Sequence, residues 1–109
     1  MAFRVDFTEL AVEDLESISK FIAEDNPTAA ARVCGGLYNL ALSLAANPLV
    51  GRITPEYNNQ AIRDIVKFNY RLVYLVNHEK QRVEILRFWH GARGFLPSLW
   101  QTPGSPGAH

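Results

Sequence analysis

Two runs near the end of the chain decide the fold: Asn69-Tyr70-Arg71-Leu72-Val73-Tyr74 and Ile85-Leu86-Arg87-Phe88-Trp89-His90-Gly91-Ala92-Arg93. Both runs are rich in β-branched and aromatic residues, which favour strands. The polar segment 77–81 lies between them and is typical of a turn. The two runs therefore predict an antiparallel hairpin.

Four cationic or titratable residues interrupt these otherwise apolar strands: Arg71, Arg87, His90 and Arg93. A cation in an apolar strand is costly unless it reaches solvent, a carboxylate or an anionic ligand. Arg71 has a candidate partner across the hairpin in Glu84, and a histidine that ends a strand often serves as a cap. The group as a whole indicates a sheet surface that meets a negatively charged partner.

Upstream of the hairpin, the sequence predicts a strand followed by a helix. Residues 3–7 alternate apolar and polar side chains, as a half-buried strand does. Thr8 is a suitable N-cap for the helix that follows. The helix extends to about Glu24, because apolar residues recur at helical spacing: Ala11, Leu15, Ile18 and Ile22. We expect the acidic residues Glu13, Asp14 and Glu16 to form a solvated helix face.

A second helix begins at Asn26-Pro27, with asparagine as cap and proline at the first helical position. Its apolar stripe comprises Ala30, Val33, Leu37, Leu40 and Leu44, and Asn47-Pro48 ends it. Gly35-Gly36 in its middle weakens the helix, which indicates close approach of the first helix or of a partner. Residues 49–60 read as a loop.

Strands at about 61–66, 70–77 and 82–90 complete the order β-α-α-β-β-β. This order predicts a two-layer α+β domain, in which two antiparallel helices pack on a four-stranded, mainly antiparallel sheet. Phe88 and Trp89 are adjacent and therefore point to opposite faces, so one of them leaves the main core. We assign residues 1–97 to this domain and residues 98–109, with Trp100, to a C-terminal tail.

Composition narrows the class of protein. The chain has 109 residues, of which 48% are hydrophobic, and contains no apolar run long enough for a membrane span. The single Cys34 excludes an internal disulfide and a thiolate metal site, so we expect a cytoplasmic protein without metal or cofactor. The net charge is zero, but it is uneven: residues 9–25 carry six acidic residues against Lys20, and residues 61–93 carry seven basic against three acidic ones.

Four short motifs in this order resemble the RelE/ParE superfamily of bacterial toxins: Asp25-Asn26-Pro27, Asn47-Pro48-Leu49-Val50-Gly51-Arg52, Asn69-Tyr70-Arg71-Leu72-Val73-Tyr74 and His90-Gly91-Ala92-Arg93. The resemblance covers about residues 3–96. It implies a toxin of a type II toxin-antitoxin system whose cognate antitoxin neutralises it by wrapping extended and helical segments over its surface. Self-association of the antitoxin-free protein is left open.

The superfamily divides by target. RelE-like members cleave mRNA in the ribosomal A site, and ParE-like members poison DNA gyrase without known catalytic residues. In its Tyr-Arg context, Arg71 corresponds to a functional arginine of the RelE-like nucleases. The tyrosine that many of these nucleases carry near the C-terminus has no match here, because Gly91-Ala92-Arg93-Gly94-Phe95 follows His90. The His-Gly-Ala-Arg ending resembles the ParE-like branch more.

Charge also favours the ParE-like branch. Proteins that act on RNA usually gain affinity from a positive excess, which this chain lacks. The favoured function is therefore gyrase inhibition. A RelE-like mRNA endonuclease is the first alternative, and a non-catalytic domain that only binds its antitoxin is the second.

The candidate site residues follow from these readings. If the protein were a nuclease, cations and an acid or base for phosphate chemistry would come from Arg63, Arg71, Arg87, His90 and Arg93. The residues expected to bind the target or the antitoxin are Arg63, Lys67, Arg71, Arg87, Trp89, His90 and Arg93. We also expect the antitoxin to bury part of a helix and at least one of Phe88 and Trp89.

Overall fold

Two helices and five strands make up the domain, which a computed structural model describes for residues 2–94 and 96. The helices are α1 (Glu9–Ala23) and α2 (Pro27–Ser43). The strands are β1 (Arg4–Phe7), β2 (Arg52–Ile53), β3 (Ile62–Lys67), β4 (Tyr70–Asn77) and β5 (Arg82–His90), and a short 3-10 helix, η1 (Gly91–Arg93), follows β5. The predicted tail 98–109, its boundary at residue 97 and Trp100 lie outside the described residues.

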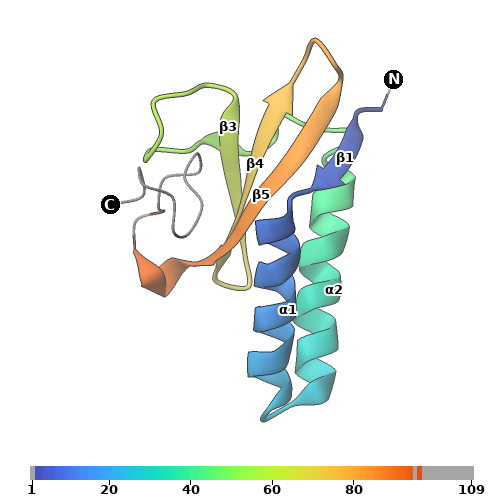
Figure 1. The fold of residues 1–109 in the computed structure, drawn as a ribbon, viewed down its shortest axis with the longest axis vertical. Coiled ribbons are helices and arrows are strands. Elements are labelled where there is room, and N and C mark those ends of the chain that lie inside the picture. Colours follow the sequence, from blue (N-terminus) through green and yellow to red (C-terminus); the bar gives the residue numbers. More distant parts are fainter. Residues whose placement is uncertain (1, 95, 97–109) are drawn as a thin grey trace.

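Both helices begin where their capping residues predict. The Thr8 side chain accepts a hydrogen bond from the Ala11 N–H at 3.2 Å, and the Asn26 side chain accepts one from Ala29 at 3.0 Å. Each bond satisfies a backbone donor that the first helical turn leaves without a partner. The caps thus fix where α1 and α2 begin, and the two helices lie side by side as a helical hairpin (Figure 1).

The sheet has five strands rather than the four that the sequence predicts, in the order β1-β5-β4-β3-β2. The additional strand is β2, which lies within the predicted loop 49–60 and pairs Arg52 with Asp64 and Ile53 with Arg63. Two residues are too few to give a strand signal in the sequence. The strand β1 runs parallel to β5, and every other pair is antiparallel.

A two-residue turn joins β3 to β4, where the sequence predicts a three-residue link. Phe68 and Asn69 have φ angles of 53° and 68°, so both adopt the left-handed conformation that a tight hairpin turn requires. This turn explains why position 36 of α2 is glycine, because a Cβ on Gly36 would lie 2.6 Å from a ring carbon of Phe68. Gly36 thus makes room for the turn rather than for α1, whereas a Cβ on Gly35 would meet nothing within 4 Å.

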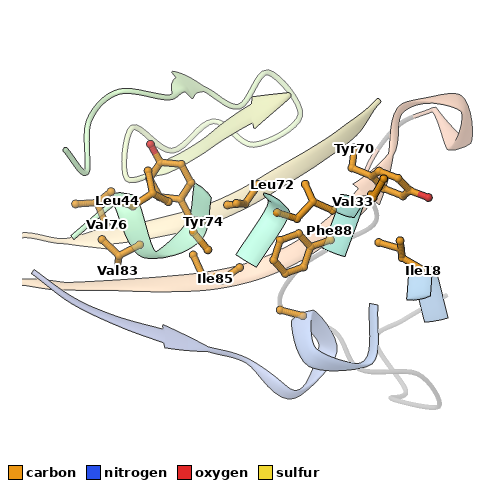
Figure 2. Packing of buried hydrophobic residues seen from close by; sticks show 13 residues of the cluster. Ile18, Val33, Leu44, Tyr70, Leu72, Tyr74, Val76, Val83, Ile85 and Phe88 are labelled. Carbon is orange, nitrogen blue, oxygen red and sulfur yellow. The ribbon is translucent and has the colours of Figure 1, made fainter. Parts of the chain in front are cut away.

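The main core lies between the helices and one face of the sheet (Figure 2). The helix residues Ile18 and Val33, and Leu44 directly after α2, meet alternate residues of β4 and β5, including Leu72 and Phe88. The alternation is that of a strand with one face on the helices. The predicted separation of Phe88 from Trp89 is confirmed, because Trp89 belongs to a second cluster.

That second cluster covers the opposite face of the sheet and comprises the buried residues Ile62, Val73, Trp89 and Leu96. Tyr57, from the long connection between β2 and β3, packs against it. Apolar clusters therefore cover both faces of the sheet where β3, β4 and β5 lie side by side. Neither described helix has the length and hydrophobicity needed to cross a lipid bilayer.

Candidate functional site

A groove of about 510 Å³ lies where α1 passes the carboxyl end of β5. The side chains that line it are Asp14, Ser17, Ile18, Phe21, Tyr70, Phe88, His90 and Arg93. Its apolar residues come from α1, β4 and β5, and Phe21 is 71% exposed although it is large and apolar. His90 and Arg93 add polar groups from the end of β5 and from η1. The groove thus offers an accessible apolar surface beside a cation.

His90 caps the start of η1, which is a role that its place at the end of a strand suggests. Its Nδ1 accepts a hydrogen bond from the Ala92 N–H at 3.0 Å, which starts η1. The imidazole also meets the Tyr70 ring edge-on, with the ring centroids 4.9 Å apart. Because Nδ1 accepts, a neutral His90 carries its proton on Nε2. The residue therefore presents a donor rather than a base.

Two arginines stack on Trp89 at the same end of the sheet. The guanidinium carbon of Arg93 lies 3.8 Å from the centroid of the Trp89 ring, and that of Arg87 lies 5.1 Å from it. The indole Nε1–H donates to the Gly94 carbonyl oxygen at 3.1 Å, which holds the ring in place. Cation–π contacts of this kind orient a guanidinium without neutralising its charge. Arg93 has no carboxylate partner among residues 2–94 and 96.

Arg87, by contrast, is paired with Asp14 of α1. Its Nε and one terminal nitrogen donate to the two carboxylate oxygens at 2.8 and 3.0 Å. The same carboxylate accepts the backbone N–H of Phe88 at 2.9 Å. This N–H lies beyond the end of β1, which pairs with β5 only as far as Ile85. Asp14 therefore takes the place of a neighbouring strand, and it is not the solvated helix residue that we expected.

Arg71 is buried in a network of four charges. It binds Asp64 and Glu56 at the same time, and the Arg71 side chain is only 11% exposed. The Nε of Arg71 donates to Asp64 at 2.8 Å, and Arg52 of β2 binds the other oxygen of Asp64 at 2.7 Å. Glu84, the candidate partner across the hairpin, binds Arg82 instead. Two cations and two anions balance, so the network is neutral.

The network changes the protonation equilibria of its members. The hydrogen bonds from Arg71 lower the pKa of Glu56 to about 2, against the opposing effect of burial. The same contacts with Glu56, and those with Asp64, raise the pKa of Arg71. The Leu96 N–H also donates to Glu56 at 3.3 Å, so the network holds Leu96. Next to it, burial raises the pKa of Tyr57 to about 12.

The structure divides the predicted site residues among three places. Arg87, Trp89, His90 and Arg93 come together at the end of β5. Arg71 lies opposite Trp89 in the neighbouring strand, but its charge is enclosed in the network. Arg63 and Lys67 lie on β3, where Arg63 donates to the Gly51 carbonyl oxygen at 2.8 Å and Lys67 lies over the Phe68 ring.

Three carboxylates that organise these places were not among the predicted site residues: Asp14, Glu56 and Asp64. The sequence carries a signal for Asp14, which follows Ala11 by three residues and precedes Ile18 by four. It therefore falls on the apolar stripe of α1 and faces the sheet. The position of Asp64 within an otherwise apolar strand is a weaker signal, and Glu56 lies in an irregular segment without any.

Comparison with protein families and solved structures identifies proteins that this chain resembles. The family model described as the ParE toxin of the type II toxin-antitoxin system parDE matches residues 5–95. No curated protein matches the sequence significantly. Among solved structures, the RelBE2 toxin-antitoxin complex of Mycobacterium tuberculosis is similar, with 26% identity, a TM-score of 0.63, and coverage of 83% of this chain and 99% of that one.

Two further structures share the fold. The chromosomal ParDE system of P. aeruginosa has a TM-score of 0.65 at 16% identity, covering 82% of this chain and 96% of that one. A mutant of the E. coli toxin RelE in its free state has a TM-score of 0.64 at 19% identity, covering 86% and 88%. Both branches of the superfamily therefore have this architecture. Because the family model spans almost the whole described domain, the chain belongs to the ParE toxin family of type II toxin-antitoxin systems.

Proposed function

We propose that this protein is a ParE-like toxin that inhibits DNA gyrase by binding it, without chemistry of its own, and that a cognate antitoxin neutralises it. The proposal rests mainly on the burial and the carboxylate pairing of Arg71. This residue corresponds to a functional arginine of the RelE-like nucleases, but its guanidinium binds two carboxylates and its side chain is 11% exposed. To stabilise a phosphate it would have to leave both, which leaves the buried Glu56 without a cation and Asp64 with Arg52 alone.

The groove between α1 and β5 supplies the proposed contact surface. An exposed aromatic side chain beside a cation with no carboxylate partner in the described residues is the composition of a protein-binding surface. Arg93 is held on Trp89, so little side-chain entropy is lost when it pairs with an acidic group of the target.

A supercoiling assay with purified gyrase tests this function. The antitoxin-free protein should inhibit supercoiling, and Arg93→Ala should weaken the inhibition at least tenfold, since a hydrogen bond to a charged group contributes about 1.5–3 kcal/mol. Its melting temperature should stay close to that of the unchanged protein. Arg82→Ala is the matched control, because Arg82 lies at the opposite end of β5 from η1 and pairs with Glu84 and Asp6. Gyrase that is unaffected by the unchanged protein would refute the proposal.

The arrangement of His90 and Arg93 favours a second candidate, RelE-like cleavage of mRNA on the ribosome. Both residues line one groove, so a donor and a cation are available to a phosphate there. Codon-dependent cleavage in a purified translation system, lost in His90→Ala and accompanied by unaffected gyrase, would establish this function instead. An absence of both activities with tight antitoxin binding would leave the binding-only alternative.

The same groove is the proposed site of neutralisation by an antitoxin helix. Hydrogen exchange should show protection of residues 14–21 and 86–90 when the antitoxin binds. Phe21→Ala should weaken that binding by about ten- to 100-fold, because burying such a side chain contributes about 1.5–3 kcal/mol. Val12→Ala is the control, since Val12 is exposed on α1 but does not line the groove. Protection confined to residues 49–60 would contradict this placement.

A further inference from the structure

The strand β1 forms an edge of the sheet (Figure 1). It pairs with β5 on one side, and no described strand lies on its other side. Toward β5, the Arg4 N–H donates to the Gln81 carbonyl oxygen at 2.9 Å, and the Thr8 N–H donates to that of Ile85 at 3.0 Å. Backbone groups alternate in direction along a strand, so the N–H and C=O of Val5 point away from β5, toward the open edge.

The residues along this edge are symmetric about Val5: Phe3, Arg4, Val5, Asp6 and Phe7. The two neighbours of Val5 have opposite charges, and the next residue on each side is phenylalanine. When two copies of the strand run antiparallel with Val5 opposite Val5, Arg4 of each copy lies opposite Asp6 of the other. The strand is therefore complementary to a second copy of itself.

The backbone and the charges select the same register. Two residues exchange hydrogen bonds in an antiparallel pair only when their N–H and C=O groups face each other, and the two Val5 residues meet this condition. A pair centred on Arg4 or on Asp6 would need backbone groups that already face β5, and it would set like charges opposite each other. In the Val5 register, Arg4 and Asp6 occupy the positions without hydrogen bonds, where opposing side chains approach most closely.

Both charged side chains of this strand are accessible. The Arg4 side chain is 76% exposed and lies 2.9 Å from Asp6 of its own strand, and Asp6 is also 3.8 Å from Arg82. Arg4 and Asp6 lie on the sheet face away from the helices, since the residues that alternate with them pack against the main core. Arg4 can therefore reach an Asp6 across the edge without breaking a buried ion pair.

Helix α2 adds an apolar side chain behind this edge. Phe7 stacks on Tyr38 with the ring centroids 5.4 Å apart, and the Phe3 N–H donates to the Ala45 carbonyl oxygen at 2.8 Å. Helix α2 therefore passes β1 in the opposite direction, and Leu42 lies between these two contacts. Leu42 is 41% exposed, so it leaves an apolar surface beside the centre of the strand.

We propose that this edge binds a second copy of the chain, so that the isolated protein forms a symmetric dimer with one continuous sheet. The two Val5 residues exchange two backbone hydrogen bonds, and Arg4 of each copy pairs with Asp6 of the other. Behind the strands, Leu42 meets Leu42 of the other copy. None of the residues that line the groove belongs to β1, so each copy keeps its groove. The proposal is therefore independent of the gyrase and antitoxin assignments.

Sedimentation of the full chain over a range of concentrations measures this dimer. The unchanged protein should dimerise reversibly. Arg4→Glu and Asp6→Arg should each weaken dimerisation at least tenfold, because the two-fold symmetry turns one substitution into two like-charge pairs. Lys20→Glu is the matched control, since it changes the net charge as Arg4→Glu does but lies in the last turn of α1, away from β1. Its effect should be under about threefold, as expected of a distant exposed charge.

A mixture of the two charge variants tests the register directly. Arg4→Glu and Asp6→Arg each repel their own copies, but a dimer with one chain of each sets opposite charges across both pairs. Mixing equal amounts, with one variant carrying a fluorophore, should restore dimerisation to within about tenfold of that of the unchanged protein. Circular dichroism and thermal unfolding establish that each variant folds. In the unchanged protein, the Val5 amide should become protected from hydrogen exchange as the concentration rises, which tests the strand pairing without a substitution.

Several results would overturn the inference. A protein that stays monomeric at every concentration, with an unprotected Val5 amide, would exclude the dimer. A dimer that is insensitive to Arg4→Glu would use another surface, and folded variants that do not associate when mixed would exclude the proposed register. Gyrase inhibition and antitoxin binding at the groove are measured separately, so failure there does not affect the result here.

Discussion

Replacing Glu56 with glutamine should destabilise the protein strongly, although Glu56 lies in an irregular segment. The substitution removes one of the two anions that balance Arg71 and Arg52, and it weakens the bond that Glu56 accepts from the Leu96 N–H. The Arg71 side chain stays buried and keeps only Asp64. A buried cation that loses a partner is costly, because the remaining charge can no longer be hydrated.

The lowered pKa of Glu56 sets the size of the effect. A fall of the Glu56 pKa from its ordinary value of 4.5 to about 2 corresponds to about 3 kcal/mol, at about 1.4 kcal/mol per pKa unit. Because the pKa is lower in the folded state, this stabilisation is fully present above about pH 4.5. It is lost as the pH falls through about 2. In a domain of this size, the melting temperature should fall by about 10 °C at neutral pH.

Urea unfolding of the unchanged protein and of Glu56→Gln, measured between pH 7 and pH 2, checks this reasoning. The difference in unfolding free energy should be about 3 kcal/mol at pH 7 and should shrink below pH 4.5. Glu84→Gln is the matched control, since Glu84 is paired with Arg82 at a partly exposed site and should cost under about 1 kcal/mol. Equal unfolding free energies of Glu56→Gln and the unchanged protein at pH 7 would refute a stabilising network. A difference in unfolding free energy that stays constant with pH would refute it as well.

Three other substitutions test the packing at particular positions by thermal or urea unfolding. Asp14→Ala should lower the unfolding free energy by about 3 kcal/mol, because it leaves Arg87 and the Phe88 N–H unpaired. Glu13→Ala, at the exposed neighbouring position, should change it little. Equal effects of the two substitutions would show that the Asp14 pairing is unimportant. Gly51→Ala should cost about 1–3 kcal/mol, since its Cβ would lie 2.8 Å from a backbone oxygen of β3. Gly35→Ala should instead stabilise the protein by up to about 1 kcal/mol, because its Cβ meets nothing within 4 Å; a loss of stability there would contradict the open surface.

The regular elements could be predicted because their signals are local. The caps at Thr8 and Asn26, the helical stripes and the strands 70–77 and 82–90 depend on neighbouring residues, and the structure has most of them within a residue or two. The exception is the end of α2, which stops at Ser43 and not at the predicted Asn47-Pro48. The strand β2 was missed because its two residues form a strand only through their pairing with β3. The Phe68-Asn69 turn was read as one residue longer because neither residue is glycine, although both adopt positive φ angles.

The site was harder to predict because its charges are balanced by residues distant in sequence. Asp14 and Arg87 are 73 residues apart, and Arg71 meets carboxylates that precede it by 7 and 15 residues. Composition reveals an excess of cations in the sheet but not which of them have partners. That distinction comes from the tertiary structure, and it separates the paired Arg71 and Arg87 from Arg93, Arg63 and Lys67.

The parallel pairing of β1 with β5 has a consequence for the timing of synthesis. Arg4 lies beside Arg82, so the first strand has no neighbour until the last one has been made. At about 5–20 residues per second, the intervening chain takes roughly 4–16 s to synthesise. During that interval the helical hairpin has no β5 to pack against, and the groove does not yet exist. A partner that recognises this groove can therefore engage the chain only after β5 and η1 have been synthesised.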